Sequence, residues 1–416
     1  MDLGTAREPA APAVPRRGVA LLGPAFVAAI AYVDPGNVAA NLTAGAKYGY
    51  LLLWVLVAAN ATAVLVQYLS AKLGIVTGRS LPELLGSRLG TGSRRAYWVQ
   101  AELVAMATDL AEVLGGAIAL YLLFEVPLLL GGLIVGLVSM AMLAVQTRRG
   151  QRPFEGVIVA LLVVIAVGFL AGLFVSPVDP VQALAGVVPR FDGTETVLLA
   201  ASMLGATVMP HAIYLHSALA RDRHGVQTED GVVRRLLRAT RWDVAGALLV
   251  AGAVNIAMLL LAASSLRGVP GTDTIEGAHA AIVAALGSGI GIVFAIGLLA
   301  SGLASTSVGC YAGAAIMGGL LAVRIPLLVR RAVTLVPALV VLGIGAEPTS
   351  ALVLSQVVLS LGIPFALVPL VRLTSDVAVM GRFANPGAVK VVAWAVVALI
   401  VSLNVALIVL TVSGAA

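Results

Sequence analysis

Charged residues are scarce in this chain: they make up 11% of its 416 residues, whereas 60% are hydrophobic. Soluble domains carry about 25% charged residues, so the shortage excludes a water-exposed surface over most of the chain. Cysteine is limited to Cys310, which excludes a disulfide framework or a cysteine-based metal cluster within one chain. The composition therefore predicts an all-α integral membrane protein.

Motifs for enzymatic chemistry are also missing. The sequence contains no nucleophile–base pair, HExxH zinc motif, phosphate-binding loop or sizeable polar domain. A membrane-embedded enzyme or receptor is thus an unsupported alternative, and we expect neither enzymatic activity nor a cofactor. The net charge of +6 could indicate nucleic-acid binding, but the positions of the charges indicate membrane topology instead.

The chain consists mostly of long apolar segments. A membrane-spanning helix needs about 20 mostly apolar residues, and eleven segments of the sequence meet this requirement. They lie at about 18–45, 50–76, 96–124, 126–146, 154–175, 196–219, 242–266, 284–318, 327–345, 349–372 and 388–413. We expect residues 1–17, rich in proline and alanine, to form a disordered cytoplasmic tail, and residues 18–416 to form one transmembrane domain.

Lysine and arginine give the orientation, because they gather in cytoplasmic loops. With a cytoplasmic N-terminus, all but three of the 26 positive residues lie inside. The exceptions are Lys47, Arg190 and Arg267. Eleven spans then place the C-terminus outside, so we expect a multi-pass protein of the bacterial inner membrane.

A helix breaker interrupts the first span. Pro35 removes a backbone donor, and Gly36 tolerates a positive φ. Asp34 and Asn37 flank this pair, and the break frees backbone carbonyls such as that of Ala31. An ordinary loop between two short helices is the alternative, but the apolar residues around the break suffice for only one span. A carboxylate at this depth indicates a functional site.

The sixth span carries an equivalent break. Pro210 interrupts it, between Met209 and His211, with Ala206 one turn earlier. A methionine in a membrane helix is normally core filler, yet two proline-interrupted helices in corresponding positions are typical of transporters with inverted repeats and a central site.

The spans divide into two repeats on this basis. We predict a five-plus-five architecture in which residues 18–175 form the first repeat and 196–372 the second. The helix at 388–413 is an addition to the repeats.

The residue types at the breaks indicate the substrate. Asp34 offers an anionic oxygen, Asn37 an amide oxygen, and the carbonyls of Ala31 and Ala206 add further oxygens. Oxygen ligands alone suit magnesium and calcium, whereas the thioether of Met209 favours softer transition-metal ions. A sodium-coupled carrier of organic solutes is the alternative on the same architecture, but such carriers hold substrate carboxylates at half-helix N-termini, which an anionic Asp34 suits less well.

The motifs DPGN in the first span and MPH in the sixth resemble the signatures of the Nramp family of proton-coupled divalent metal transporters, and the bacterial MntH-type manganese transporters look closest. The resemblance extends through AANATAVLVQYLSAKLGIVTG, QAELVAMATDLAE and LSQVVLSLGIPFALVPL, and so covers nearly the whole chain. It implies a LeuT-type fold and symport of Mn²⁺, and also Fe²⁺, Co²⁺, Cd²⁺ or Zn²⁺, with protons by alternating access. It implies metal ligation by the residues named above, with Gln356 as an additional ligand in an occluded state.

The third span holds three carboxylates within an apolar helix. Glu102, Asp109 and Glu112 lie near one helical face, which indicates a proton relay. The alternative is a set of structural ion pairs with Arg330 and Arg331, and both can hold together. The family resemblance assigns proton movement away from Asp34 to the second and third of these carboxylates.

A histidine beside the site also titrates near neutral pH. His211 could handle protons or gate the site next to Asp34, and a packed polar side chain is the alternative. We expect divalent metal ions, protons and the lipid bilayer as partners, no nucleic acid, and a functional monomer.

Overall fold

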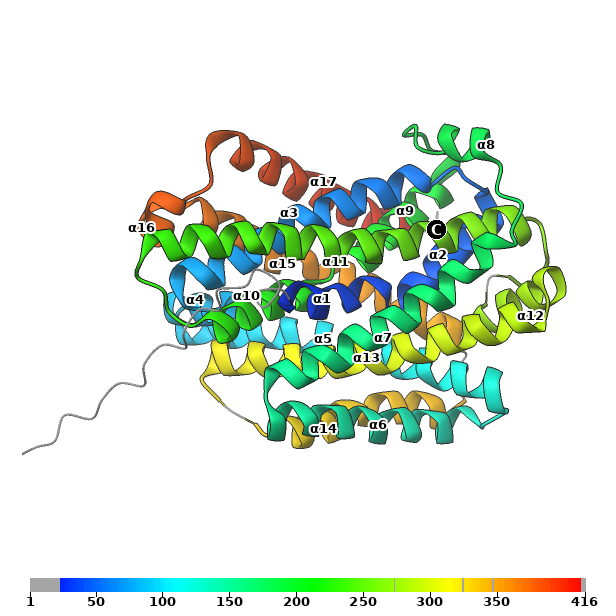
Figure 1. The fold of residues 1–416 in the computed structure, drawn as a ribbon, viewed down its shortest axis with the longest axis horizontal. Coiled ribbons are helices and arrows are strands. Elements are labelled where there is room, and N and C mark those ends of the chain that lie inside the picture. The colour runs from blue at the N-terminus through cyan, green and yellow to red at the C-terminus, as the bar shows by residue number, and fades with distance from the viewer. Residues whose placement is uncertain (1–22, 273, 324, 346–347, 413–416) are drawn as a thin grey trace, which may run out of the picture.

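The computed structural model describes residues 23–272, 274–323, 325–345 and 348–412, so the predicted tail at 1–17 lies outside the described residues. The described part is built from helices (Figure 1). In chain order they are α1 (Pro24–Ala29), η2 (Ile30–Val33), α2 (Pro35–Tyr48), α3 (Leu53–Thr77), α4 (Leu81–Arg88), α5 (Thr91–Phe124), α6 (Leu128–Arg149), α7 (Gln151–Leu170), η3 (Ala171–Phe174), α8 (Pro180–Ala185), α9 (Gly193–Thr207), α10 (Pro210–His224), α11 (Asp230–Ser265), α12 (Ile275–Leu286), α13 (Ser288–Leu321), α14 (Leu327–Gly343), α15 (Pro348–Ser375), α16 (Val377–Met380), η4 (Gly381–Phe383) and α17 (Gly387–Val412).

Nine stretches of the described chain are helical, long and apolar enough to cross a membrane. The two other predicted spans are the first, which is broken into α1, η2 and α2, and α14, which has 17 residues and carries Arg330 and Arg331. The helices therefore follow the predicted all-α, multi-span order. Each half opens with a broken helix followed by four further long helices, and α17 comes last, as the predicted five-plus-five architecture with one added helix requires.

Some boundaries differ from the sequence prediction. The eighth span is α13 alone, and the short helix α12 precedes it as a separate element. Gly287, with φ of 92°, separates the two. The seventh span, α11, begins at Asp230 rather than at 242, because its first turns carry arginines that an apolar window leaves out.

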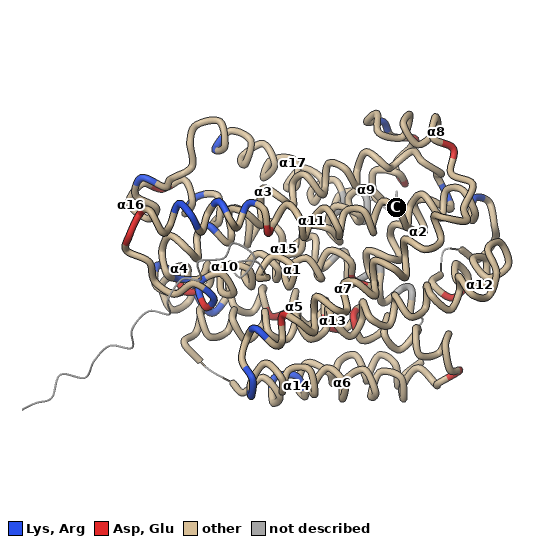
Figure 2. Tube along the Cα trace, viewed as in Figure 1, with Lys and Arg blue, Asp and Glu red and all other residues tan. Residues whose placement is uncertain are grey.

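Lysine and arginine gather at one end of the molecule, around α4, α16 and the start of α11 (Figure 2). We call this the basic end. The three cations expected on the other side, Lys47, Arg190 and Arg267, line one shared cavity of about 640 Å³. This segregation follows the pattern from which the orientation was predicted.

The long helices α5 and α13 pack against each other at the centre of the bundle. Their backbones approach closely, since a Cβ at Gly302 would lie 2.8 Å from the nitrogen of Gly116. Small residues at such crossings permit the dense packing that holds membrane helices together. The pair also packs against both broken helices.

Candidate functional site

The first break has the geometry of a capped helix start. Asp34 adopts an extended conformation between η2 and α2, and its Oδ1 accepts a hydrogen bond of 2.8 Å from the backbone N–H of Asn37. Aspartate is a favoured N-cap, and proline, here Pro35, is favoured in the first turn because its missing N–H would have no partner there. The local sequence therefore dictates both the end of one half-helix and the start of the next.

Polar side chains of neighbouring helices satisfy carbonyls near this break. Asn255 of α11 donates its amide to the carbonyl of Tyr32 at 2.6 Å. Ser301 of α13 donates its hydroxyl to the carbonyl of Val33 at 2.5 Å. An irregular backbone is stable at membrane depth only with such partners. The packed neighbouring helices thus stabilise the break.

The second break lies between α9 and α10. Helix α9 ends at Thr207, Met209 is extended, and Pro210 begins α10. Met209 is fully buried. The two halves of this helix therefore meet inside the protein, as the sequence predicts.

The two breaks lie against each other. The side-chain amide of Asn37 donates to the carbonyl of Ala206 at 2.8 Å and to Oδ1 of Asp34 at 2.7 Å. The hydroxyl of Thr207 donates to Oδ1 of Asn37 at 3.3 Å. Asn37 therefore contacts a residue 169 positions away in the sequence.

An unpaired carboxylate oxygen marks the centre of this junction. Oδ2 of Asp34 is buried and has no hydrogen-bond partner among the described residues. Ala31, Ala206 and Met209 are also fully buried. An ionised oxygen without a partner at this depth is costly, and a dication would offset that cost.

Gln356 reaches the same region from α15. A Cβ on Gly36 would overlap its side-chain amide, so Gln356 lies directly against the first break. Neither its Oε1 nor its Nε2 has a hydrogen-bond partner among the described residues. The structure thus joins Asp34, Asn37 and Ala206 by hydrogen bonds and places Gln356 against the first break. The other two proposed metal ligands, Ala31 and Met209, are buried at the same two breaks. Within the described residues, no group of three or more His, Cys, Asp and Glu side chains could hold a metal ion instead.

The carboxylates of α5 are partly paired. Glu102 forms an ion pair of 2.6 Å with Arg330, and Asp109 forms one with Arg331. Both arginines are buried in α14. The ion-pair interpretation and the relay interpretation therefore apply to the same side chains.

Glu112 differs from the other two. Its carboxylate lies against Gly309 of α13, and neither oxygen has a hydrogen-bond partner among the described residues. One turn further along α5, Gly115 is in contact with the ring of Pro35. Glu112 is thus placed between the first break and the pair of Asp109 with Arg331.

His211 and His216, two of the three histidines of α10, have different neighbours. Nδ1 of His211 lies 3.5 Å from the hydroxyl of Thr108, next to Asp109 on α5. Nδ1 of His216 lies 2.8 Å from Oε1 of Gln67. The amide of Gln67 in turn donates to the hydroxyl of Tyr32 at 2.7 Å.

Several polar partners of the breaks were not singled out from the sequence. These are Gln67, Asn255 and Ser301, together with Thr306, whose hydroxyl donates to Asp109 at 2.6 Å. Each is a buried polar residue inside an apolar span. That property alone would have identified them, since polar residues in lipid-embedded helices are costly unless they have partners.

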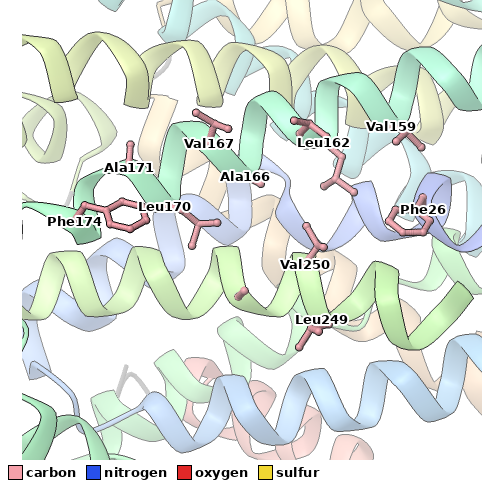
Figure 3. A pocket seen from close by; sticks show the side chains of 12 residues that line it. Phe26, Val159, Leu162, Ala166, Val167, Leu170, Ala171, Phe174, Leu249 and Val250 are labelled. Atoms are coloured by element: carbon pink, nitrogen blue, oxygen red, sulfur yellow. The ribbon is translucent and has the colours of Figure 1, made fainter. Parts of the chain in front are cut away.

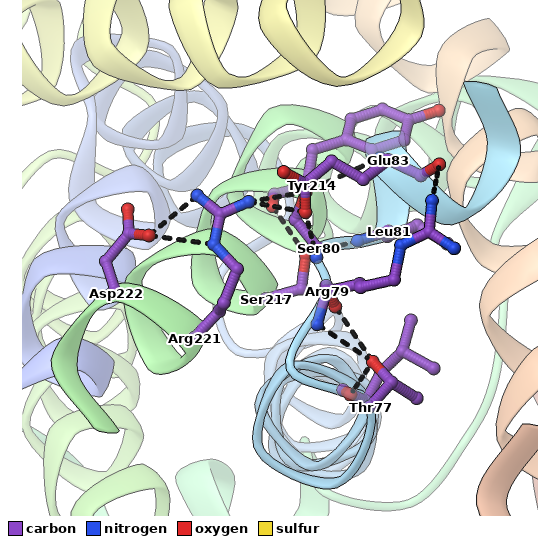
Figure 4. A network of polar contacts seen from close by, with 10 residues as sticks. Thr77, Arg79, Ser80, Leu81, Glu83, Tyr214, Ser217, Arg221 and Asp222 are labelled. Atoms are coloured by element: carbon purple, nitrogen blue, oxygen red, sulfur yellow. Dashed lines mark hydrogen bonds and ion pairs between the residues drawn. The ribbon is translucent and has the colours of Figure 1, made fainter. Parts of the chain in front are cut away.

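Helix α10 is fastened at the basic end. Its Arg221 binds Glu83 and Asp222, and Ser217 accepts a hydrogen bond from the N–H of Leu81 (Figure 4). Burial acts to raise the pKa of Glu83, but hydrogen bonds from Ser80 and Arg221 outweigh it and lower this pKa from its ordinary value. Helix α10 is thereby joined to the corner between α3 and α4.

Helix α1 is held at the same end by α11. Asp243 accepts hydrogen bonds from the backbone N–H groups of Gly23 and Ala25, at 3.0 and 3.1 Å. At the opposite end, Glu195 of α9 accepts from Lys47 and Tyr48 of α2. Each half-helix of the two breaks therefore has a polar anchor at its outer end.

Known proteins share the sequence and the fold of this chain. Residues 25–410 match the family model described as natural resistance-associated macrophage protein-like, or Nramp. The divalent metal cation transporter MntH of Mycobacterium tuberculosis is 63% identical over 394 residues, covering 95% of this chain and 92% of that protein. The manganese transporter of Eremococcus coleocola is 32% identical, with a TM-score of 0.86 over 94% of this chain and 87% of that one. MhsT, solved with L-phenylalanine, is 15% identical and shares the fold, with a TM-score of 0.62 over 94% of this chain and 98% of that one.

Proposed function

Since the chain belongs to the Nramp family and is a divalent metal cation transporter, we propose that it couples the inward movement of Mn²⁺ to that of protons. Fe²⁺, Co²⁺, Cd²⁺ and Zn²⁺ suit the same mixture of ligands and are proposed as further substrates. The basic end would face the cytoplasm of a bacterial cell, with the N-terminus inside and the C-terminus outside. The chain would work as a monomer.

One observation supports the position of the metal site above all others. Asn37 joins the first break to the carbonyl of Ala206 at the second, while Oδ2 of Asp34 next to it is buried and has no partner in the described part of the chain. An incoming ion would meet an anionic oxygen, neutral oxygens and the thioether of Met209. A single anionic ligand holds a dication loosely enough for release, and the sulfur disfavours hard ions such as Mg²⁺ and Ca²⁺.

The closed state of the site supports transport by alternating access. Asp34, Asn37 and Met209 are fully buried, and the half-helices around them are tied at both ends by polar contacts. These contacts are individually weak where they are exposed, at about 0.2–1 kcal/mol each. Opening one end at a time would admit or release the ion without opening a continuous pore.

Protons would leave the site by the α5 side. Glu112 has no hydrogen-bond partner among the described residues and lies between the first break and the pair of Asp109 with Arg331. Beyond that pair along α5 comes Glu102 with Arg330. We propose that a proton moves along this series while the metal ion follows the gap between the half-helices, with His211 beside the start of the route.

A flux assay tests the proposal. The full-length protein is reconstituted in liposomes that contain a metal-sensitive dye, and Mn²⁺ entry is measured with and without an inward proton gradient. We expect entry that rises with the proton gradient and is accompanied by internal acidification. Dependence on a sodium gradient, or uptake of organic solutes without Mn²⁺ flux, would contradict the proposal.

A further inference from the structure

A groove open to the lipid-facing surface runs between α7, α11 and α1. Its volume is about 610 Å³. Apolar side chains line it along its length (Figure 3), among them Phe26, Val159, Ala166, Phe174, Leu249 and Ala253. The positions of Val159 and Phe174 imply a length of about 22 Å along the helix. This exceeds the roughly 15 Å depth of hydrocarbon in one leaflet, so the groove is long enough for an acyl chain.

On α7, the row of apolar residues that lines the groove is preceded by an arginine, Arg152. Arg152 precedes Val159 by two helical turns and therefore lies on the same face of α7. It is exposed and lies in the first turn of α7. The apolar wall on this side thus ends in a guanidinium group.

On α11, an arginine likewise precedes the groove-lining residues on the same helical face. Arg238 precedes Leu249 by about three turns, or about 16 Å along the helix, and the two share a face. Trp242 lies between them on that face and is 74% exposed. Tryptophan is enriched where the hydrocarbon meets the headgroups. The level of Trp242 therefore matches that of a membrane interface, with Arg238 just beyond it.

The acidic groups nearby already have partners. Glu155 is buried, pairs with Arg223 at 3.0 Å and accepts from Gln151 at 2.6 Å. Asp243 is buried and binds the first N–H groups of α1. None of the ion pairs among the described residues includes Arg152 or Arg238, although Arg152 also interacts electrostatically with Glu155.

We propose that the groove binds one anionic phospholipid from the leaflet at the basic end. Its phosphate would lie between Arg152 and Arg238, Trp242 would lie at the glycerol level, and an acyl chain would fill the groove. A zwitterionic lipid satisfies the groove equally well but gains less from the two guanidinium groups. An anionic headgroup is therefore preferred, as at other basic clusters next to membrane helices.

This site also touches the transport machinery. Phe26, which lines the groove, belongs to α1, the half-helix that leads to the first break. A Cβ on Gly246 of α11 would lie 3.9 Å from its ring, one turn from Trp242. Any movement of α1 away from α11 thus changes the groove, so the bound lipid and the position of α1 are coupled. The binding site itself does not depend on which ion is transported.

Native mass spectrometry of the full-length protein tests this proposal. The protein is equilibrated with equal amounts of phosphatidylglycerol and phosphatidylcholine that carry the same acyl chains. We expect retention of one phosphatidylglycerol molecule in preference to phosphatidylcholine. Arg152→Gln and Arg238→Gln should each lower this preference about five-fold. Arg95→Gln, which removes an exposed arginine of the basic end away from the groove, should leave it unchanged.

A second pair of variants tests the groove. Ala166→Trp should fill it and lower retention of both lipids, and Val163→Trp, at a more exposed lining position, serves if the first variant melts at a lower temperature than the wild type. Equal retention of the two lipids by the wild type would overturn the proposal. So would an equal effect of Arg95→Gln, or full lipid retention by a folded groove-filling variant.

Discussion

Lys47, in the last turn of α2, forms an ion pair of 2.8 Å with Glu195, in the first turn of α9. Each charge lies at the helix end that its sign stabilises, because a cation is favoured at a C-terminus and an anion at an N-terminus. Tyr48 donates to the same carboxylate at 2.6 Å. The outer halves of the two broken helices are thus joined directly to each other.

Glu195→Ala should loosen this outer closure. A cysteine placed at Ala40, in a protein whose Cys310 is replaced by serine, would report access through its rate of modification by a thiol reagent added outside. Because the two contacts of Glu195 contribute about 0.2–1 kcal/mol each, we expect the rate to rise about two- to thirty-fold. Asp192→Asn is the control, since it removes an acid of the same cavity without breaking the contact to α2. Equal rates in both variants would show that the contact does not hold the end closed.

Asp34→Asn should nearly abolish metal uptake. The asparagine oxygen can still accept from the N–H of Asn37, so the helix start is preserved, but the anionic ligand is lost. We expect Mn²⁺ affinity, measured by calorimetry, to fall at least 100-fold, with an unchanged melting temperature. Asp243→Asn removes another buried carboxylate and should retain binding. Substantial remaining uptake by the first variant would place the site elsewhere.

Met209→Ala should broaden selectivity. The variant keeps the oxygen ligands, so Mn²⁺ transport continues, while the loss of the thioether admits Ca²⁺ or Mg²⁺. Liposome fluxes of the three ions provide the measurement. Met203→Ala, another fully buried methionine of the same span, is the control and should keep Ca²⁺ excluded. If Ca²⁺ stays excluded in both variants, the thioether does not set selectivity.

Asp109→Asn should lower proton flux more than metal binding. The substitution removes a titratable group from the α5 series but leaves the residues at the two breaks intact. Internal pH and Mn²⁺ affinity are measured on the same preparation. If Asp109 has a purely structural role, proton flux and Mn²⁺ affinity should fall equally. Adding Arg331→Gln to Asp109→Asn should then restore proton flux and Mn²⁺ affinity together, because it removes the unpaired buried charge.

The sequence was sufficient to predict the breaks and the residues around them. A proline next to an aspartate or a methionine inside an apolar span is a local signal of a helix break. The helices begin and end where that signal predicts. The partners of the breaks were harder to predict, because Asn255 and Ser301 are distant in the sequence and only packing brings them to the carbonyls of Tyr32 and Val33.

Ends of helices were predicted less well than their cores. Helix α11 continues toward the basic end through Arg234, Arg235 and Arg238, since helical hydrogen bonds do not require apolar side chains outside the membrane. The anchors at Glu195 and Asp243 depend on contacts between distant segments, and no local pattern in the sequence indicates them.

Asp34 is the single acid among the six proposed ligands, and in the proposed transport cycle this would set the electrical behaviour. When it is ionised, the empty site carries one negative charge, and a dication turns this into one positive charge. A second dication would then be repelled, which would limit each proposed cycle to one ion. The loaded site is also driven toward a negative cell interior, by about 2.3 kcal/mol per elementary charge for each 100 mV that is crossed. Transport should therefore produce a measurable current whose size depends on membrane voltage.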